Sequence, residues 1–571
     1  MPTLNWIGKD AVVNHHHDVT YKTLDKQYTF VNGETIIDNG RDGVHTVSTE
    51  NKIIHGDNLE ALKALLPEYE GRIKCIYIDP PYNTGNENWV YNDNVNSPRI
   101  RKWLGQVVGK EAEDLTRHDK WLCMMYPRLK LLQLLLSNNG IVFISIDDNE
   151  STYLKLLCDE IFGSANFRGQ ITIVGNPGGR DYGGIARMHE YVLVYSKTSS
   201  AEIYLIKDKE HSFKLFDNQG GFELRELRNR NVRFNKENRP NLYYPFYIDT
   251  EHPDNNGLFP ISIDPVNGWY ELWPQPSQGI NVVWRWGKDK STQNLNINIC
   301  GKAKKDGGYM IVEKYREERK MAGSVWWDKE TRTESGTLLV KDIFNNKSFD
   351  YPKPIELVMR CIEMGSGEEP NSIILDSFAG SGTTAHAVLN LNKQDGGNRK
   401  FILVEMEDYA ENITAERVRR VINGYGEGKN KTEGTSGGFS YYELGEPIMN
   451  GDYLNENQPI EKIREYIWYS ETHTALRQAQ GSAVSETPPE PVEGANIPAD
   501  NPCYLGNHNN VGYYFYYEKN TTTTLDKAFL NTISVPADQY IIYADNCLLS
   551  DEFMRLNNIV FKKIPRDIRK F

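Results

Sequence analysis

The feature that most restricts the fold is a short apolar segment that two prolines bring to an end. Residues 74–78 (KCIYI) have the composition of a buried strand. Pro80 and Pro81 follow almost at once, and proline cannot continue a sheet because it lacks a backbone N–H. Asp79 and Tyr82 are therefore predicted on a stiff loop at the carboxyl end of a strand, where open α/β sheets bind ligands. An acid, a proline carbonyl and an aromatic ring suit a planar substrate with an amino group, such as a nucleobase.

A second strand, glycine turn and helix is predicted near residue 380. The apolar residues 372–375 precede Asp376 and the glycine-rich residues 377–382, and a helical pattern follows. Such a turn lets the backbone approach a nucleotide-like ligand at a helix N-terminus. Glu405 ends the next apolar strand, close to the spacing of about 20 residues at which dinucleotide folds place an acid on the ribose.

Together, the Asp-Pro-Pro-Tyr and Phe-Ala-Gly-Ser-Gly motifs resemble those of the DNA amino-methyltransferases, which use S-adenosyl-L-methionine to methylate an exocyclic base nitrogen. The catalytic motif comes first, as in the family's β class. The resemblance implies base flipping, with the flipped base stacked on Tyr82 and its amino group bound by Asp79 and the Pro80 carbonyl. An aspartate at the first motif position favours adenine N6 over cytosine N4. The residues implied as catalytic are Asp79, Pro80, Pro81 and Tyr82, and those implied as cofactor-binding are Asp57, Lys353, Asp376, Phe378, Gly380, Gly382, Thr383 and Glu405.

Two of these residues also have ordinary structural explanations. In the resembled family an acid at the position of Asp57 contacts the adenine amine of the cofactor, but Asp57 is also a good helix cap. Residues 349–354 look like the family motif that packs on the methionine end of the cofactor. However, Lys353 followed by Pro354 is equally a common start of a helix.

Alternating apolar strands and helices predict an α/β fold with a Rossmann-like, doubly wound methyltransferase sheet. The expected organisation also contains an inserted target-recognition domain and a small C-terminal α/β module. Polar residues 84–110 are either a loop that closes over a flipped base or a solvated connection. The glycine-rich residues 175–184 are either a mobile loop that faces DNA or a plain connection. The expected segments are 1–50 (docking), 51–200 (catalytic half), 201–340 (target recognition), 341–440 (cofactor half) and 441–571, with a flexible linker near 479–502.

The net charge of −13 argues mildly against a nucleic-acid partner, but DNA responds to the local charge of one face. Basic and aromatic residues interleave between 200 and 340, a mixture that suits contacts to phosphates and base edges. The β class has its target-recognition domain at this point of the chain. The residues predicted to contact DNA are Arg225, Arg228, Arg230, Arg233, Trp284 and Arg285.

Composition excludes several other classes. No segment approaches the roughly 20 apolar residues of a membrane helix, and the N-terminus lacks the features of a signal peptide. The seven cysteines are scattered without Cys-x-x-Cys spacing, which indicates a reduced, cytoplasmic protein without a zinc site. His15, His16 and His17 are adjacent and cannot easily converge on one ion, so no metal site is predicted.

More diffuse similarity along the chain resembles the Mod subunit of type III restriction-modification systems. That resemblance implies double-stranded DNA as substrate, a homodimer and a separate restriction (Res) subunit. Two alternatives remain: a cytosine-N4 or RNA methyltransferase on the same scaffold, and a DNA-reading specificity subunit that guides a separate nuclease and translocase.

Overall fold

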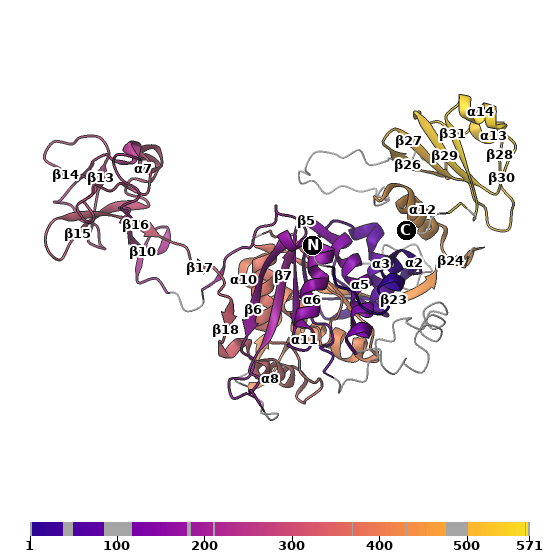
Figure 1. Cartoon of the computed structure of the whole chain (residues 1–571), viewed down its shortest axis with the longest axis horizontal. Helices are drawn as coiled ribbons and strands as arrows, with labels where there is room; N and C mark the ends of the chain where they lie inside the picture. The colour runs from indigo at the N-terminus through magenta and orange to yellow at the C-terminus, as the bar shows by residue number, and fades with distance from the viewer. Residues whose placement is uncertain are drawn as a thin grey trace. The chain divides into compact units, whose positions relative to one another are not determined.

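The structure is a computed structural model of the 571-residue chain, and it describes residues 3–37, 49–84, 117–179, 184–208, 212–367, 369–428, 431–451, 453–474, 501–565 and 567–568. The chain forms two compact units (Figure 1). The first unit comprises Met1–Tyr204 and Gly323–Phe571, and the second comprises Leu205–Ala322. The predicted α/β fold with an inserted second unit is confirmed.

The first unit is built on an 11-stranded sheet. Its six central strands are parallel neighbours, and antiparallel strands flank them on both sides. In spatial order the strands are β18 (Val325–Trp326), β6 (Phe167–Ile173), β7 (Glu190–Ser196), β5 (Leu136–Ile146), β4 (Ile73–Ile78), β19 (Ile373–Asp376), β20 (Lys400–Glu405), β3 (Lys52–His55), β23 (Gly438–Pro447), β1 (Lys22–Val31) and β2 (Glu34–Ile37).

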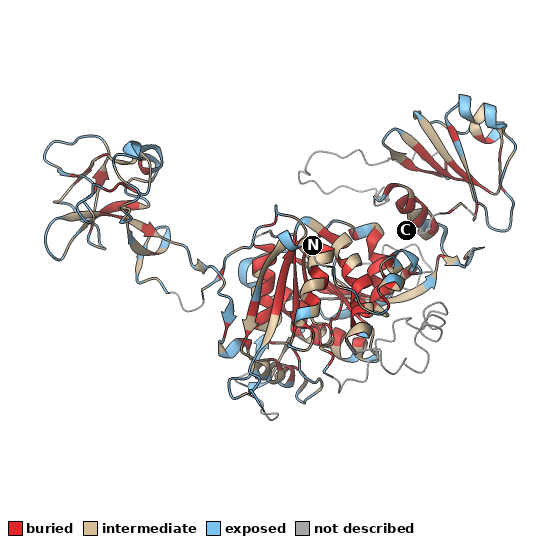
Figure 2. Cartoon of the chain, in the orientation of Figure 1, coloured by how far each residue is buried: buried red, intermediate tan, exposed pale blue. Residues whose placement is uncertain are grey.

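Helices cover both faces of this sheet. Side chains alternate along a strand, so Ile76 and Ile78 of β4 face one layer while Cys75 faces the other. The first layer consists of α3 (Asn58–Tyr69), α5 (Arg117–Leu135) and α6 (Ser151–Cys158), which share one hydrophobic core with β4. The opposite layer contains α9 (Ile355–Ser366), α10 (Thr383–Asp395) and α11 (Glu416–Asn423). Figure 2 shows this buried core along the central strands and the helices that cover them.

A glycine lets one of these helices lie directly on the sheet. A Cβ atom at Gly365 of α9 would lie 2.7 Å from Cys75 Sγ and 3.0 Å from a ring carbon of Phe143. Only hydrogen fits at this contact, because a carbon atom would overlap both neighbours. The close packing fixes α9, and with it the loop that precedes the helix.

The edges of the units differ from the expected segment boundaries. β1, in the expected docking segment, pairs with β23, which itself spans the expected boundary at 440. The second unit ends at Ala322 rather than at residue 340, since β18 pairs with β6 and α8 (Thr333–Phe344) belongs to the first unit. Pairings between distant segments of this kind leave no local sequence signal.

The second unit is mostly β structure around a core of its own. Its larger sheet has the strand order β12 (Leu258–Phe259), β15 (Ile299–Ala303), β16 (Tyr309–Tyr315), β10 (Gly220–Glu226) and β9 (Leu215–Asp217). The smaller sheets are β13 (Ile261–Ser262), β11 (Phe246–Ile248) and β14 (Tyr270–Leu272), and the pair β8 (Ile206–Lys207) with β17 (Arg319–Lys320); α7 (Lys288–Asn294) is its helix.

The C-terminal part of the first unit forms the predicted small α/β module. Its sheet contains β26 (Tyr504–His508), β27 (Val511–Phe515), β29 (Gln539–Ala544) and β31 (Ile559–Lys563), with the helices α12 (Ile460–Thr472), α13 (Lys527–Leu530) and α14 (Asp551–Leu556). Most of the expected linker, 479–500, lies outside the described residues. Across the part of the chain that the structure describes, no helix has the length and apolar composition needed to span a membrane.

Candidate active site

The sheet brings the two sequence motifs together. β4, which ends before Asp79, and β19, which ends at Asp376, are adjacent parallel strands with Cys75 opposite Ile374. Parallel neighbours end at the same edge of a sheet, so the proline loop and the glycine turn lie side by side. They line one cleft with a volume of about 1260 Å³. Ten of the twelve residues predicted as catalytic or cofactor-binding line this cleft; Asp57 and Gly382 do not.

Buried hydrogen bonds hold the proline loop. Trp121 donates its indole N–H to the Pro81 carbonyl at 2.7 Å. Asn83 is fully buried with a positive φ of 58° and donates its side-chain amide to Glu150 Oε1. His118 Nδ1 lies 2.7 Å from the same oxygen. These contacts hold the end of the loop in a backbone conformation that asparagine tolerates better than most residues. The rest of the expected polar loop, 85–110, lies outside the described residues.

Asp79 faces a lysine and a second acid. Lys353 Nζ forms an ion pair with Asp79 Oδ1 at 3.3 Å, a contact longer than its others. The lysine donates to Glu190 Oε2 at 2.7 Å and to the Tyr82 hydroxyl. Burial raises the pKa of Asp79, and the charge of Lys353 opposes that rise. Burial would lower the pKa of Lys353, but the two carboxylates outweigh it and hold that pKa above its usual value.

The position of Lys353 depends on a neighbouring helix. Gly336 of α8 lies so close to the preceding turn that a Cβ atom would be 2.2 Å from the Pro352 carbonyl oxygen. Pro354 then serves as the N-cap residue of α9. The structure places Lys353 against Asp79 and Tyr82 in the cleft, and its contact with the cofactor stays a prediction.

The glycine turn is organised by two buried carboxyl groups. Asp376 accepts hydrogen bonds from Phe378 N at 3.0 Å and from the Thr384 hydroxyl at 2.5 Å. Glu405 accepts from Gly380 N at 2.7 Å and from Glu407 N at 3.0 Å. Burial raises the pKa of Asp376 and of Glu405 to about 7 in each case, although these hydrogen bonds lower both. Both groups can thus exchange protons near neutral pH.

The backbone of the turn requires glycine at two positions. Gly380 and Gly382 have positive φ angles of 52° and 79°. A Cβ atom at Gly382 would lie 3.1 Å from the Thr414 carbonyl oxygen, so this glycine packs on protein instead of lining the cleft. Phe349 lies over the turn, because a Cβ atom at Gly380 would touch its ring at 3.4 Å. The turn therefore opens toward the cleft between an aromatic ring and the start of α10.

The cleft is acidic. Its lining includes eight carboxylates but only three Lys or Arg residues, one of which, Lys353, is already paired. Such a cleft attracts a cation and repels free phosphate. The lining acids are Asp79, Asp147, Asp148, Glu190, Glu334, Asp350, Asp376 and Glu405, and the bases are Arg187, Arg332 and Lys353.

Asp57 has the structural role that its sequence context suggested. Its carboxylate caps α3 by accepting from Leu59 N at 2.9 Å and from Glu60 N at 3.1 Å. Arg128 Nη2 lies 3.7 Å from its other oxygen. The proposed contact to the cofactor is not tested by this geometry.

Glu190 was missed by the sequence analysis. It begins β7, and in a parallel sheet the start of a strand lies at the edge opposite the active site. However, β7 runs antiparallel to β5, so Glu190 starts where β5 ends. The acid therefore reaches Tyr82, whose hydroxyl donates to Glu190 Oε2 at 2.8 Å. The sequence contained one signal for this: Glu190 begins a strand that no helix precedes. Antiparallel neighbours need no crossover helix, so this pattern favours an antiparallel strand.

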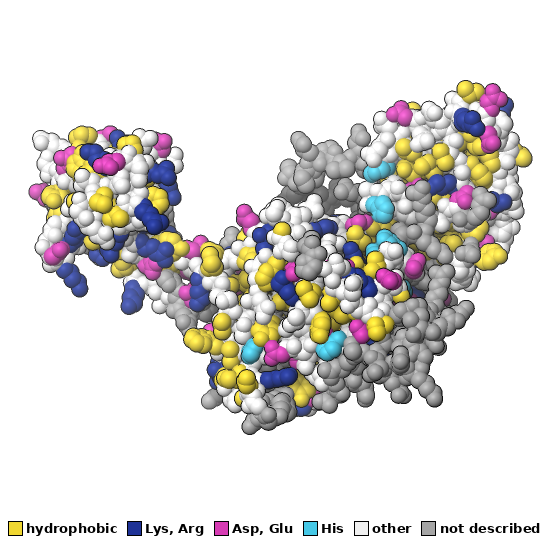
Figure 3. Space-filling view, in the orientation of Figure 1, with side chains coloured by type: hydrophobic (Ala, Val, Ile, Leu, Met, Phe, Trp, Pro, Cys, Tyr) yellow, Lys and Arg dark blue, Asp and Glu magenta, His cyan; other side chains and the backbone are white. Residues whose placement is uncertain are grey.

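The predicted DNA-binding residues separate into two groups. The side chain of Trp284 is buried, with 2% exposed, and donates its indole N–H to the Tyr244 carbonyl, so its assignment as a DNA contact is corrected. A buried ring cannot reach a base edge. The arginines remain on the surface of the second unit, where Lys and Arg side chains gather (Figure 3). Four of them pair with acids at 2.6–2.7 Å: Arg225 with Glu223, Arg228 and Arg230 with Glu226, and Arg285 with Glu313; Arg233 is exposed.

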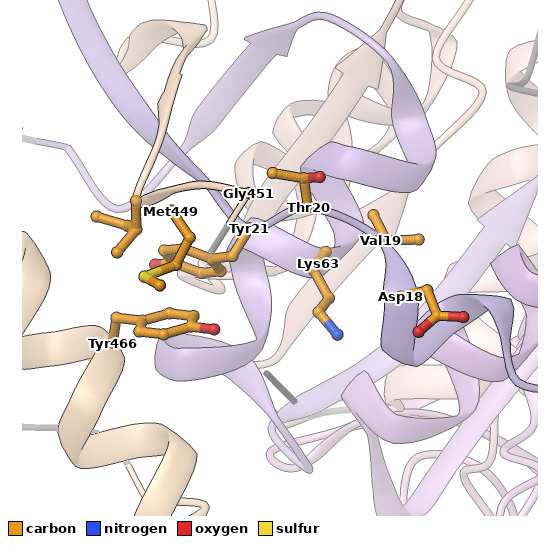
Figure 4. Close-up of a pocket in the computed structure, with 9 residues that line it drawn as sticks. Asp18, Val19, Thr20, Tyr21, Lys63, Met449, Gly451 and Tyr466 are labelled. Atoms are coloured by element: carbon orange, nitrogen blue, oxygen red, sulfur yellow. The ribbon is translucent and has the colours of Figure 1, made fainter. Parts of the chain in front are cut away.

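A second, smaller cavity of about 90 Å³ lies away from the cleft (Figure 4). Lys63 lines it, is buried and donates to the His16 carbonyl at 2.9 Å. Burial lowers the pKa of Lys63 to about 8. His16 is one of the three adjacent histidines. Among the described residues, no group of three His, Cys, Asp or Glu side chains is arranged so that it could hold a metal ion.

An α/β sheet with an acidic cleft at its carboxyl edge, formed by a proline loop beside a glycine turn, has the form of an enzyme active site. The chain belongs to the DNA methylase family, whose pattern matches residues 73–416. That match covers more than half of the chain and includes both motifs.

Three curated relatives are similar over most of the chain. The EcoPI Mod subunit of a type III restriction-modification enzyme from Escherichia phage P1 is 34% identical over 71% of this chain and 64% of its own length. The type II methyltransferase M.KpnI from Klebsiella pneumoniae is 35% identical over 63% and 81%. The StyLTI Mod subunit from Salmonella typhimurium is 31% identical over 74% and 67%. The chain thus matches slightly less than two thirds of the EcoPI subunit.

Proposed function

We propose that this protein is a site-specific DNA methyltransferase that transfers a methyl group from S-adenosyl-L-methionine to adenine N6. One observation carries the proposal. Asp79 Oδ1 is buried in the cleft, yet it receives no hydrogen bond from the described residues. A buried acceptor without a donor costs about 1–3 kcal/mol, and the amino group of a flipped base would supply that donor.

The chain's own residues would prepare the base for attack. The ring of Tyr82 stacks on the flipped adenine, while Asp79 and the Pro80 carbonyl accept hydrogen bonds from its amino group. These bonds favour a pyramidal nitrogen whose lone pair points into the cleft, which is positioning and electrostatic catalysis. The amino nitrogen must lose one proton as its new bond to carbon forms. Asp79 lies where it can hold that proton, since burial raises its pKa.

The residues of the glycine turn fit the cofactor. The sulfonium supplies an activated methyl group when the cofactor is bound. Asp376, Phe378, Gly380, Thr383 and Glu405 line the cleft on this side, so backbone and carboxylates can contact the cofactor. The excess of carboxylates favours a cation. Transfer removes the charge on sulfur, so the product is held less strongly by the same acids.

The second unit is proposed to recognise the DNA. Residues 205–322 contain 19 Lys or Arg and 16 Asp or Glu residues, a net charge of +3, whereas the whole chain carries −13. This positive unit suits a phosphate backbone that the acidic cleft would repel. Arg225, Arg228, Arg230, Arg233 and Arg285 are the proposed contacts; four of them already pair with acids, so Arg233 is expected to contribute most.

Similarity to the two Mod subunits supports the modification and recognition role in a type III restriction-modification system. In that role the protein would act in the cytoplasm as a homodimer on double-stranded DNA and would associate with a Res subunit. The alignment with M.KpnI favours a second candidate, a type II methyltransferase that acts without a Res subunit, because the alignment spans 81% of that enzyme. Both candidates use the same active site.

Nucleoside mass spectrometry tests the activity. We expect DNA from a methylation-free host that expresses this chain to contain N6-methyladenine and no N4-methylcytosine. Accumulation of N4-methylcytosine instead would show that the aspartate at position 79 does not decide the base. Co-expression with a Res subunit from the same source then separates the two candidates, because only a type III subunit co-purifies with it.

A further inference from the structure

Two carboxylates share one lysine at the proline loop. Lys353 Nζ lies 2.7 Å from Glu190 Oε2 and 3.3 Å from Asp79 Oδ1. The same ammonium lies 4.6 Å from the centre of the Tyr82 ring. All four side chains line the cleft. The lysine is therefore placed between two acceptors of the same charge, and its short contact is the one with Glu190.

Glu190 makes the shorter contact with Lys353. Its Oε2 accepts from Lys353 and also from the Tyr82 hydroxyl at 2.8 Å, while the tyrosine in turn accepts from the lysine. Three groups thus form a closed set of charge-assisted hydrogen bonds. Asp79 is outside this hydrogen-bonded set: its Oδ1 lies 3.3 Å from the ammonium as an ion pair but receives no hydrogen bond.

We propose that Glu190 is a positioning residue that draws Lys353 away from Asp79 and orients Tyr82, so that Asp79 Oδ1 stays open to the amino group of the flipped base. This inference rests on the proposed function and adds a residue to its active site. Glu190 does not touch the base; it acts through Lys353 and Tyr82.

The charges of Glu190 and Lys353 also determine whether Asp79 is ionised and open. Loss of the Glu190 charge frees Lys353 to move from its 3.3 Å ion pair into a short hydrogen bond with Asp79, which occupies the acceptor that the base needs. Loss of the Lys353 charge leaves two carboxylates side by side, and one of them then holds a proton, as closely spaced acids do. Loss of both charges restores an ionised Asp79 without a competing cation. Both single substitutions are therefore expected to slow methyl transfer. The Glu190 substitution does so by blocking Asp79 with Lys353, and the Lys353 substitution does so by leaving a proton on one of the two carboxylates.

Single-turnover methylation of duplex DNA tests this reasoning. We expect Glu190→Gln and Lys353→Met each to slow methyl transfer at least tenfold, and the double variant to recover to within a few-fold of the wild-type rate. The acid limb of the pH–rate profile should move to lower pH in Glu190→Gln and to higher pH in Lys353→Met. Cofactor affinity should change little in Glu190→Gln, since the hydrogen bonds of Glu190 among the described residues go to Tyr82 and Lys353 and not to the glycine turn.

The control is Glu68→Gln, which removes a glutamate from an ion pair with Lys52 at 3.2 Å outside the cleft. Melting temperatures of all variants show whether they fold. A double variant as slow as the product of the two single effects, with an unshifted pH profile, would overturn the proposal and leave Glu190 with a packing role. Failure of the proposed function looks different, because the wild-type protein itself would then transfer no methyl group to duplex DNA.

Discussion

Cofactor binding is expected to strengthen with pH because of the two buried carboxyls at the glycine turn. Burial places the pKa values of Asp376 and Glu405 at about 7. At pH 6 such a group is about 90% protonated, and at pH 7.5 about 25%. A bound cation favours the ionised form and lowers both pKa values. If they fall below about 5, the affinity for S-adenosyl-L-methionine rises about eightfold per carboxyl between these pH values, and about 70-fold for both.

Isothermal titration calorimetry in buffers of different ionisation enthalpy measures both the affinity and the protons exchanged. We expect the release of about one proton in total at pH 7, half from each group. Glu405→Gln should keep only the eightfold dependence that Asp376 supplies. An affinity that changes less than twofold between pH 6 and 7.5, with no proton release, would refute the reasoning. The α-amino group of the cofactor, with a pKa of about 8, stays mostly protonated throughout this range.

The same pKa values determine how stability depends on pH in the free protein. A carboxyl whose folded pKa is raised binds its proton more tightly in the folded state, so its unfavourable contribution is absent below about pH 4 and complete above about pH 7. The melting temperature of the free protein should therefore fall as the pH rises across this window, and saturating cofactor should reduce that fall.

Three further predictions follow from individual contacts. Gly365→Ala places a carbon 2.7 Å from Cys75 Sγ and should lower stability by about 1–3 kcal/mol in chemical denaturation. Asp57→Ala removes a helix cap and should lower stability by about 1 kcal/mol; an unchanged cofactor Kd would limit this residue to capping. Arg233→Ala should weaken DNA binding and reduce the salt slope by about 1, whereas Trp284→Phe should lower the melting temperature of the second unit without changing that slope.

The positions of Asp79 and Asp376 were predictable, because each stands at the end of an apolar strand. Strand β4 leads into Asp79 and strand β19 leads into Asp376, and parallel neighbours necessarily end at one edge. Local sequence therefore predicted each motif at the end of a strand, whereas the pairing of β4 with β19 joins segments that are distant in the chain and leaves no local signal.

Other features depend on long-range packing that local sequence does not record. Glu190 joins the site only because β7 runs antiparallel in an otherwise mostly parallel sheet. Trp284 directly precedes the exposed Arg285 in sequence, yet its ring faces the core of the second unit. A mixed aromatic and basic pattern cannot distinguish a packed ring from a contact surface, since both have the same spacing.

The most direct test of the central claim is single-molecule sequencing of DNA from a methylation-free host that expresses either this chain or its Asp79→Ala variant. The proposed function predicts N6-methyladenine at one short sequence motif with the wild-type chain and none with the variant. Unmodified DNA from a wild-type protein that is folded and binds S-adenosyl-L-methionine would contradict autonomous methylation of duplex DNA by this cleft.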